Sequence, residues 1–314
     1  MRILVVGAGS IGGYFGGRLL EAGRDVTFLV RARRAAQLAS AGLVIRSPVG
    51  DAKLPAPPTV SAEALRTPFE LVLLSCKAYD LNGAMDSMAG AVGPRTSVLP
   101  LLNGLAHLDV LASRFGAARI LGGLCVISST LEPDGRIVHL NNAQLLAFGE
   151  RDGSRSARAA AIESALSGTL FEARCSDAIL QVMWEKWVFI AAAAGVTCLM
   201  RAAIGDIVAA GAADLATALF EECAAIAARN GYPPRVDSVR QSLQVLTAAG
   251  SPITASMFRD IEYGAPIESE QILGDLLRRA GKEVPERSLL RVACAHVRAY
   301  EIRRLREATA AHGG

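Results

Sequence analysis

The chain has 314 residues and a formal net charge of +3 at pH 7, from 33 Lys and Arg against 30 Asp and Glu. Hydrophobic residues make up 51% of it, which is enough for the cores of two domains without stabilising disulfides or metals. The basic residues are scattered along the chain, so the charge pattern indicates neither a nucleic acid nor an anionic membrane as a partner.

The six cysteines are irregularly spaced, and most of them lie in apolar stretches. This spacing predicts reduced thiols in a cytoplasmic protein, and no metal site. The apolar stretch around residues 191–194 is bounded too closely by Lys186 and Arg201 to predict a membrane span. Glycines interrupt the apolar run after Val6, which is not the pattern of a signal peptide.

The first 31 residues combine a strand, a glycine turn and a helix. Residues 2–6 form a short apolar, β-branched stretch that is typical of a buried strand. Gly7, Gly9 and Gly12 follow at the spacing G-x-G-x-x-G, and apolar residues then recur at helical period. In this order the pattern predicts a dinucleotide site, in which glycines admit the pyrophosphate and the helix N-terminus attracts it. The alternative is a glycine-rich turn that binds no ligand.

Residues 24–30 are expected to form the next strand, and the residue at its end distinguishes NAD from NADP. An NAD site usually has Asp or Glu there, whereas this chain has Arg31, followed by Arg33 and Arg34. A guanidinium binds a 2′-phosphate through paired hydrogen bonds, so the sequence favours NADP with Arg31 as the phosphate ligand. The alternative is that these arginines lie on a solvated helix face.

The rest of the first 175 residues alternates between strand and helix patterns. Strands are expected at 43–46, 70–75, 97–102, 119–126, 136–140, 144–149 and 170–175, and helices at 31–37 and 155–167. Lys77 and Asn103 follow two of these strands, at the strand ends where doubly wound sheets bind ligands. Each residue has a plain alternative, since Lys77 can be a solvated loop lysine and Asn103 part of an ordinary turn.

From residue 176 onward the pattern becomes helical. Helices are expected at 178–199, 206–229, 236–248, 254–262, 267–280 and 286–307. The predicted fold class is therefore α/β plus all-α, with an N-terminal Rossmann-type doubly wound sheet over 1–175 and a helical C-terminal domain over 176–314. The last helix carries apolar residues that are candidates for a homodimer interface: Leu289, Leu290, Val292, Ala293 and Val297.

Lys186 is a candidate proton donor in the first of these helices. Its neighbours at helical spacing are apolar: Val182, Met183, Phe189 and Ile190. Loss of solvation on such a face is expected to lower the pKa of a lysine towards a range useful for proton donation. The alternative is a lysine whose stem covers the core while its ammonium group reaches water.

Ser256 and Glu268 lie on either side of a break at residues 264–266. Such a break can bring the end of one helix beside the start of the next. Glu268 would lie in a first helical turn, where a carboxylate is also favourable for purely structural reasons. Glu262 and Glu270 are rivals for any role given to Glu268.

Taken together, these segments resemble the ketopantoate reductases (2-dehydropantoate 2-reductases), which reduce 2-dehydropantoate to pantoate with NADPH. The resemblance runs from residue 3 to about residue 300. It is carried by GAGSIGG (7–13), LVR (29–31), CKAYD (76–80), LLNG (101–104), WEKW (184–187), SM-x-x-D (256–260) and IESE (267–270).

The resemblance implies roles for single residues. Lys186 matches the general acid that protonates the ketone oxygen as hydride arrives, and Glu268 matches a glutamate beside the cofactor ribose and the active site. The implied substrate ligands are Asn103, Ser256 and Lys186. The implied NADP ligands are Gly7, Ala8, Gly9, Ser10, Ile11, Gly12, Arg31, Lys77, Asn103 and Glu268. The nicotinamide is expected to lie over a cleft between the two domains.

The chain departs from the family at two positions. The family has asparagines four and eight residues after the catalytic lysine, where this chain has Ile190 and Ala194. Without these amides a polar substrate loses hydrogen bonds, so the reduction chemistry is better supported than the pantoate specificity. One alternative is therefore a reductase of a less polar 2-oxo acid, and another is an NADP-binding sensor without turnover. The presence of Lys186, Ser256 and Glu268 together argues against the sensor.

Overall fold

The computed structural model describes residues 1–281 and 288–312. The chain divides into two compact units, Met1–Leu180 and Gln181–Gly314. The predicted boundary at residue 175 coincides with the end of strand β10 (Glu172–Cys175), shortly before helix α6 (Ile179–Met200) passes from one unit into the other.

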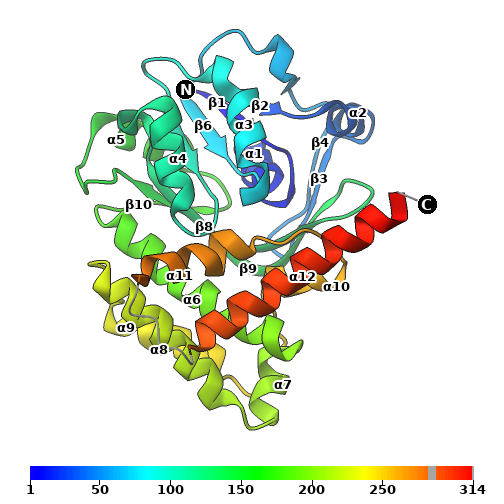
Figure 1. Cartoon of the computed structure of the whole chain (residues 1–314). Coiled ribbons are helices and arrows are strands. Elements are labelled where there is room, and N and C mark those ends of the chain that lie inside the picture. The colour runs from blue at the N-terminus through cyan, green and yellow to red at the C-terminus, as the bar shows by residue number, and fades with distance from the viewer. Residues whose placement is uncertain (282–287, 313–314) are drawn as a thin grey trace. The chain divides into compact units, whose positions relative to one another are not determined.

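The first unit contains a five-stranded parallel sheet in the order β5-β2-β1-β6-β7. Figure 1 labels its central strands β2, β1 and β6. Its strands are β1 (Arg2–Val6), β2 (Asp25–Leu29), β5 (Thr59–Val60), β6 (Leu71–Leu74) and β7 (Ser97–Pro100). β1 is central, and Ile3 pairs with Val26 of β2 on one side and with Leu71 of β6 on the other. Because every pairing is parallel, the carboxyl ends of these strands meet at one edge of the sheet.

Helices and short turns connect these strands. The helices are α1 (Ser10–Glu21), α2 (Ala32–Ala41), α3 (Leu81–Met88), α4 (Ala106–Phe115) and α5 (Ala157–Leu166). The 3₁₀ turns are η1 (Ala62–Ala64), η2 (Ala78–Asp80), η3 (Ala89–Ala91) and η4 (Ala117–Arg119). α2 continues past its expected end at residue 37, since alanines and Leu38 sustain it until Gly42 follows at φ +76°.

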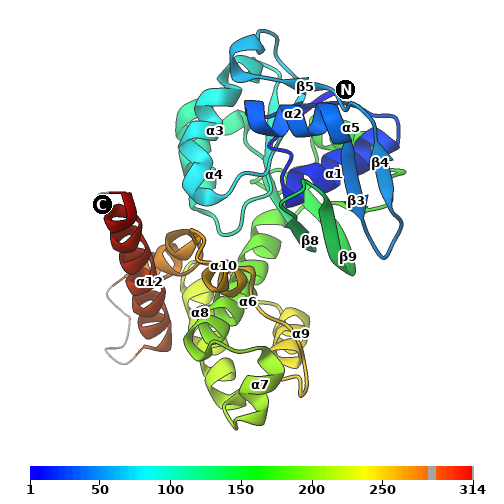
Figure 2. The same ribbon diagram turned by 90° about the vertical axis from the view of Figure 1, so that its right-hand side faces the viewer.

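A second sheet has the order β10-β9-β3-β4, with β8 paired to β9 (Figure 2). Its other strands are β3 (Leu43–Arg46), β4 (Ala52–Leu54), β8 (Gly122–Leu131) and β9 (Ile137–Gly149). The prediction of separate strands at 136–140 and 144–149 is wrong, because β9 is continuous. β8 pairs with both ends of β9. Its register shifts between Ile127 and Ser129, so one irregular position in the pairing lies where the sequence indicated a gap between two strands.

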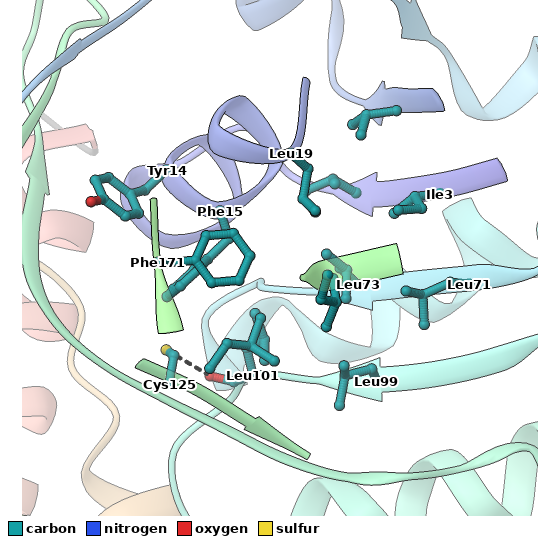
Figure 3. Close-up of a cluster of buried hydrophobic side chains, with 14 of the residues drawn as sticks. Ile3, Tyr14, Phe15, Leu19, Leu71, Leu73, Leu99, Leu101, Cys125 and Phe171 are labelled. Atoms are coloured by element: carbon teal, nitrogen blue, oxygen red, sulfur yellow. Dashed lines mark hydrogen bonds between the residues drawn. The ribbon is translucent and has the colours of Figure 1, made fainter. Parts of the chain in front are cut away.

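α1 contacts both sheets, and its glycines permit this. A Cβ on Gly16 would stand 2.6 Å from the ring of Phe28 in the first sheet, and one on Gly17 would stand 2.7 Å from Leu43 in the second. Large side chains of the same helix fill the remaining space: Phe15 meets Phe171 edge to face, with ring centroids 4.9 Å apart (Figure 3). The helix that follows the glycine turn is thus fixed by packing on two sides.

The second unit is helical, as predicted. α6 is followed by α7 (Ile204–Ala209), α8 (Ala213–Arg229), α9 (Val236–Leu246), α10 (Ser256–Glu262), the π-helical turn η5 (Glu270–Gly274), α11 (Asp275–Arg279) and α12 (Leu289–His312). The prediction of one helix over 206–229 is wrong, since Gly211, at φ +78°, separates α7 from α8. The expected start of the last helix at Glu286 lies outside the described residues.

α6 is largely buried, whereas α12 buries one part of its apolar side chains and exposes another. α6 is long and apolar enough to cross a membrane, but 72% of its most apolar window is buried inside the fold, as in a core helix. On α12, Leu290, Ala293 and Val297 are buried within the chain, whereas Val292 is 54% exposed. Most of the residues expected at a homodimer interface therefore pack inside the protein itself.

Candidate cofactor and active site

The glycine turn between β1 and α1 fits a dinucleotide. Gly7 adopts φ +91°, and a Cβ on Gly12 would stand 2.2 Å from the Gly7 carbonyl oxygen, so neither position tolerates a side chain. Among the residues that the structure describes, no heavy atom beyond its chain neighbours lies within 4 Å of a Cβ on Gly9. Gly9 is the N-cap residue of α1, and among the described residues no side chain forms a capping hydrogen bond there. The first-turn N–H groups and the helix dipole are therefore not engaged by an N-cap side chain, which suits binding of a pyrophosphate.

Two side-chain contacts that the sequence did not predict hold this turn in place. The Ser75 hydroxyl, at the end of β6, donates to the Val6 carbonyl at 3.0 Å. The Nε of Arg34, on α2, donates to the Ala8 carbonyl at 2.9 Å. Arg34 is half-buried, and burial lowers its pKa, so this arginine does not lie on a solvated face. In the sequence Arg34 stands out only as one of three arginines after the second strand, and nothing there indicates its contact with Ala8.

Arg31 lies just beyond β2, after Val30, and is the N-cap residue of α2. Its side chain is 84% exposed, and its Nη2 lies 3.2 Å from Oδ1 of Asp80, in the turn η2 that follows β6. The structure thus places the guanidinium at the carboxyl edge of the sheet, where a ribose phosphate can reach it. Its role as a phosphate ligand remains a prediction.

Lys77 and Asn103 lie at the same edge. Lys77 follows β6 and Asn103 follows β7, and both are half-buried. Since β1, β6 and β7 are consecutive parallel strands, the first unit brings these two residues to the edge that carries the glycine turn. This unit therefore contains the predicted cofactor ligands other than Glu268, together with one predicted substrate ligand, Asn103.

Lys186 lies in the middle of α6, which is uninterrupted from Ile179 to Met200. Because residues four apart stack in one row on a helix, Ile190 and Ala194 lie on the same face as Lys186. Lys186 and Ile190 are half-buried, whereas Ala194 is 2% exposed. The face beside the ammonium group is thus apolar, as the sequence indicates.

Glu268 is 7% exposed and lies in the same unit as Lys186. The indole Nε1 of Trp187, the residue after Lys186, donates to the Ile272 carbonyl at 2.8 Å. The Ile272 N–H in turn donates to the Glu268 carbonyl at 3.0 Å. Helix α6 is therefore tied, through one buried indole, to the π-helical turn after Glu268, and such turns are frequent at functional sites.

The rival carboxylates are held in ion pairs. Glu270 lies 2.5 Å from Arg298 and 3.0 Å from Arg278, and these hydrogen bonds and charges lower its pKa. Glu262 pairs with Arg201 on the surface. Their side chains are about half exposed, in contrast to Glu268.

Ser256 is exposed at the first position of α10. Gly264, at φ +66°, and Pro266 follow α10 and lead to Glu268. The second unit thus contains Lys186, Ser256 and Glu268, on three separate segments.

The described residues hold no group of three or more His, Cys, Asp or Glu side chains placed to bind a metal ion. Burial raises the pKa of the Cys198 thiol to about 12 and raises that of Cys223 as well. These two thiols therefore stay protonated near neutral pH, which suits a packing role.

Two family models match most of the chain. Residues 3–153 match the model "Ketopantoate reductase PanE/ApbA", and residues 178–301 match the model of its C-terminal part. The chain belongs to the ketopantoate reductase family. Members of this family use NADPH, and the protein is an NADP-dependent oxidoreductase. The predicted family and fold class are confirmed.

Individual relatives agree with this assignment. An uncharacterized oxidoreductase of Bacillus subtilis, YkpB, is 36% identical over 302 residues, which cover 96% of this chain and 99% of that protein. A 2-dehydropantoate 2-reductase of Mesorhizobium japonicum is 26% identical, over 91% of this chain and 94% of that protein. The crystal structure of 2-dehydropantoate 2-reductase from Geobacter metallireducens superposes with a TM-score of 0.86 at 28% identity, covering 95% of this chain and 99% of that one.

Proposed function

We propose that this ketopantoate reductase family member reduces a 2-oxo acid with NADPH, with 2-dehydropantoate, the substrate in the names of several relatives, as the first candidate. The observation that carries the proposal is the position of Lys186. It lies half-buried on an apolar row of α6, and the neighbouring Trp187 ties this helix to the segment of buried Glu268. A cation held in such surroundings suits a proton donor better than a solvated surface lysine does.

The first unit would bind the cofactor. The N–H groups at the start of α1 would hold the pyrophosphate, and Arg31 would bind the 2′-phosphate. Lys77 and Asn103 follow β6 and β7, which lie on the other side of β1 from Arg31, and would border the nicotinamide end of the site.

The chemistry assigns separate tasks to the bound cofactor and to the protein. NADPH, when bound, supplies the hydride that adds to the keto carbon. The Lys186 ammonium group would donate a hydrogen bond to the ketone oxygen, stabilise the negative charge that develops there and transfer its proton to it. Ser256 and Asn103 would position the substrate by hydrogen bonds, and Glu268 would contact the cofactor ribose.

The row beside Lys186 favours a second candidate substrate. Ile190 and Ala194 offer an alkyl chain and a methyl group where an amide would bind a hydroxyl. A substrate hydroxyl that finds no hydrogen-bond partner in the site loses binding free energy, so the site no longer favours the hydroxylated substrate. A 2-oxo acid with an alkyl group in place of the hydroxymethyl of ketopantoate is therefore expected to react at least as well.

Steady-state oxidation of NADPH with a panel of 2-oxo acids tests the proposal. The panel contains ketopantoate, its analogue with methyl in place of hydroxymethyl, and straight-chain 2-oxo acids. Turnover of any of these supports the reductase, and the ranking of the first two identifies the substrate class. Binding of NADPH without turnover of any member would overturn the reductase in favour of a sensor.

We also propose a homodimer in the cytoplasm. Val292, Ile302 and Leu305 of α12 are more than half exposed and apolar, which suits burial against a second subunit. Sedimentation of the full chain tests the dimer, and cell fractionation tests the location. A monomer at micromolar concentration would contradict the first expectation.

A further inference from the structure

We propose that Asp80 sets the cofactor selectivity of this protein. In this account the Asp80 carboxylate competes with the 2′-phosphate of NADPH for the Arg31 guanidinium, and so reduces the preference for NADPH over NADH. The inference rests on the proposed role of Arg31 in binding the 2′-phosphate.

The ion pair lies across the end of the central strand. Arg31 lies just beyond β2, after Val30, and Asp80 closes the turn after β6. These two strands flank β1 on opposite sides. The Asp80 N–H donates to the Lys77 carbonyl at 2.9 Å, so the carboxylate is carried on a closed turn. The contact of 3.2 Å between Arg31 and Asp80 therefore spans the edge at which the glycine turn begins.

The two anions seek the same donors. The N–H donors of a guanidinium have a fixed geometry. Each edge of the group can bind one carboxylate or one phosphate, but not both at once. The Arg31 side chain is 84% exposed and the Asp80 side chain 44% exposed. Ion pairs open to solvent are weak, so a phosphate can displace the carboxylate. The displaced carboxylate then stays near a phosphate of like charge and repels it.

NADH does not meet this competition, because its ribose carries a hydroxyl in place of the phosphate. A carboxylate near that hydroxyl can accept its hydrogen bond, which is the interaction that NAD sites usually provide after the second strand. An NAD site has its carboxylate after the second strand, here β2. Asp80 follows β6, on the other side of β1. The sequence alone conceals this carboxylate, since it lies 49 residues away from its partner.

Titration calorimetry with NADPH and with NADH tests the proposal on the wild-type chain and on Asp80→Asn. The amide keeps the shape of the side chain but removes its charge. We expect the Kd for NADPH to fall by about 2- to 5-fold, the scale of one exposed charge interaction. The Kd for NADH should stay unchanged or rise. Added salt should shrink the gain for NADPH.

The matched control is Asp86→Asn. Asp86, on α3, forms a comparable exposed pair with Arg114 at 3.3 Å, so its substitution removes the same charge outside the proposed contact. We expect both Kd values of this variant to match the wild type. An equal gain for NADPH in Asp86→Asn would reduce the effect to net charge and overturn the proposal.

Further outcomes separate this inference from the role of Arg31. If Asp80→Asn weakens NADPH binding, or strengthens both cofactors equally, the competition is refuted. If Asp80→Asn has no effect while Arg31→Ala weakens NADPH binding, the proposed role of Asp80 is refuted and that of Arg31 stands. If Arg31→Ala leaves NADPH binding unchanged, the proposed phosphate site fails. In the double variant, the gain from Asp80→Asn should disappear, because the group for which the anions compete is gone.

Discussion

The two units provide their shares of the site by different means. In the first unit the pyrophosphate site is made of backbone, from one contiguous turn that begins at Gly7 and ends at Gly12. In the second unit Lys186, Ser256 and Glu268 are side chains on three segments, two of them joined by the contact between Trp187 and Ile272. A backbone site depends on spacing that can be read in a few residues, whereas a side-chain site depends on tertiary contacts. The first should therefore govern cofactor affinity, and the second turnover.

Lys186→Ala should show the largest effect. Loss of the proton donor is expected to lower kcat/KM for the best substrate by about 10²–10⁴, the usual contribution of general acid catalysis. Steady-state kinetics on the best member of the 2-oxo acid panel measures it. Normal turnover by this variant would remove Lys186 from the mechanism.

Arg31→Ala should affect the other unit. The loss of charge-assisted hydrogen bonds to the 2′-phosphate is expected to raise the Kd for NADPH by about 10- to 100-fold. The Kd for NADH should change little, because that ligand lacks the phosphate. Calorimetric titration with both cofactors measures the difference. Equal affinities for the two cofactors in the wild-type protein would refute the assignment.

Trp187→Phe tests the link between the two helical segments of the second unit. The ring is kept, but the buried Ile272 carbonyl loses its indole donor. The free energy of unfolding should fall by about 1–3 kcal/mol, the cost of an unsatisfied buried group. Denaturant unfolding measures it, with Trp184→Phe as the control, since that buried ring stacks on Tyr232. An equal loss of unfolding free energy in both variants would show that the smaller ring, and not the lost hydrogen bond, causes the destabilisation.

The double change Ile190→Asn with Ala194→Asn tests whether the second unit lacks the amides that ketopantoate needs. If missing amides limit the use of ketopantoate, kcat/KM for it should rise about tenfold, the worth of one good hydrogen bond. Ala194 is 2% exposed, so an amide there needs space, and Ile190→Asn alone is the companion variant. A wild-type protein that already prefers ketopantoate with a micromolar KM would contradict this explanation of the departure.

The same comparison explains how far the sequence could predict the fold. The apolar runs of β1, β6 and β7 predict buried strands, because they are short, rich in Val, Leu and Ile, and bounded by turn or polar residues. The continuity of β9 depends on its pairing with β8, and the break at Gly211 depends on tertiary context, since a helix tolerates a lone glycine. Periodicity contains neither fact.

The site shows the same limit. The spacing of its glycines identified the turn, and the end of one strand identified Arg31. The contacts of Ser75, Arg34 and Asp80 could not be predicted, because their partners lie 69, 26 and 49 residues away in sequence. Such contacts appear only once the strands are placed side by side. Lys186 and Glu268 stood out from spacing alone only as candidates with plain alternatives, and the family resemblance gave them roles.

Titration of NADPH into Lys186→Ala protein tests the division of labour most directly. If the first unit binds the cofactor and the second supplies the chemistry, the Kd for NADPH should match that of the wild-type chain, although turnover is largely lost. A Kd raised as far as in Arg31→Ala would contradict the account, because Lys186 would then be a cofactor ligand rather than the proton donor.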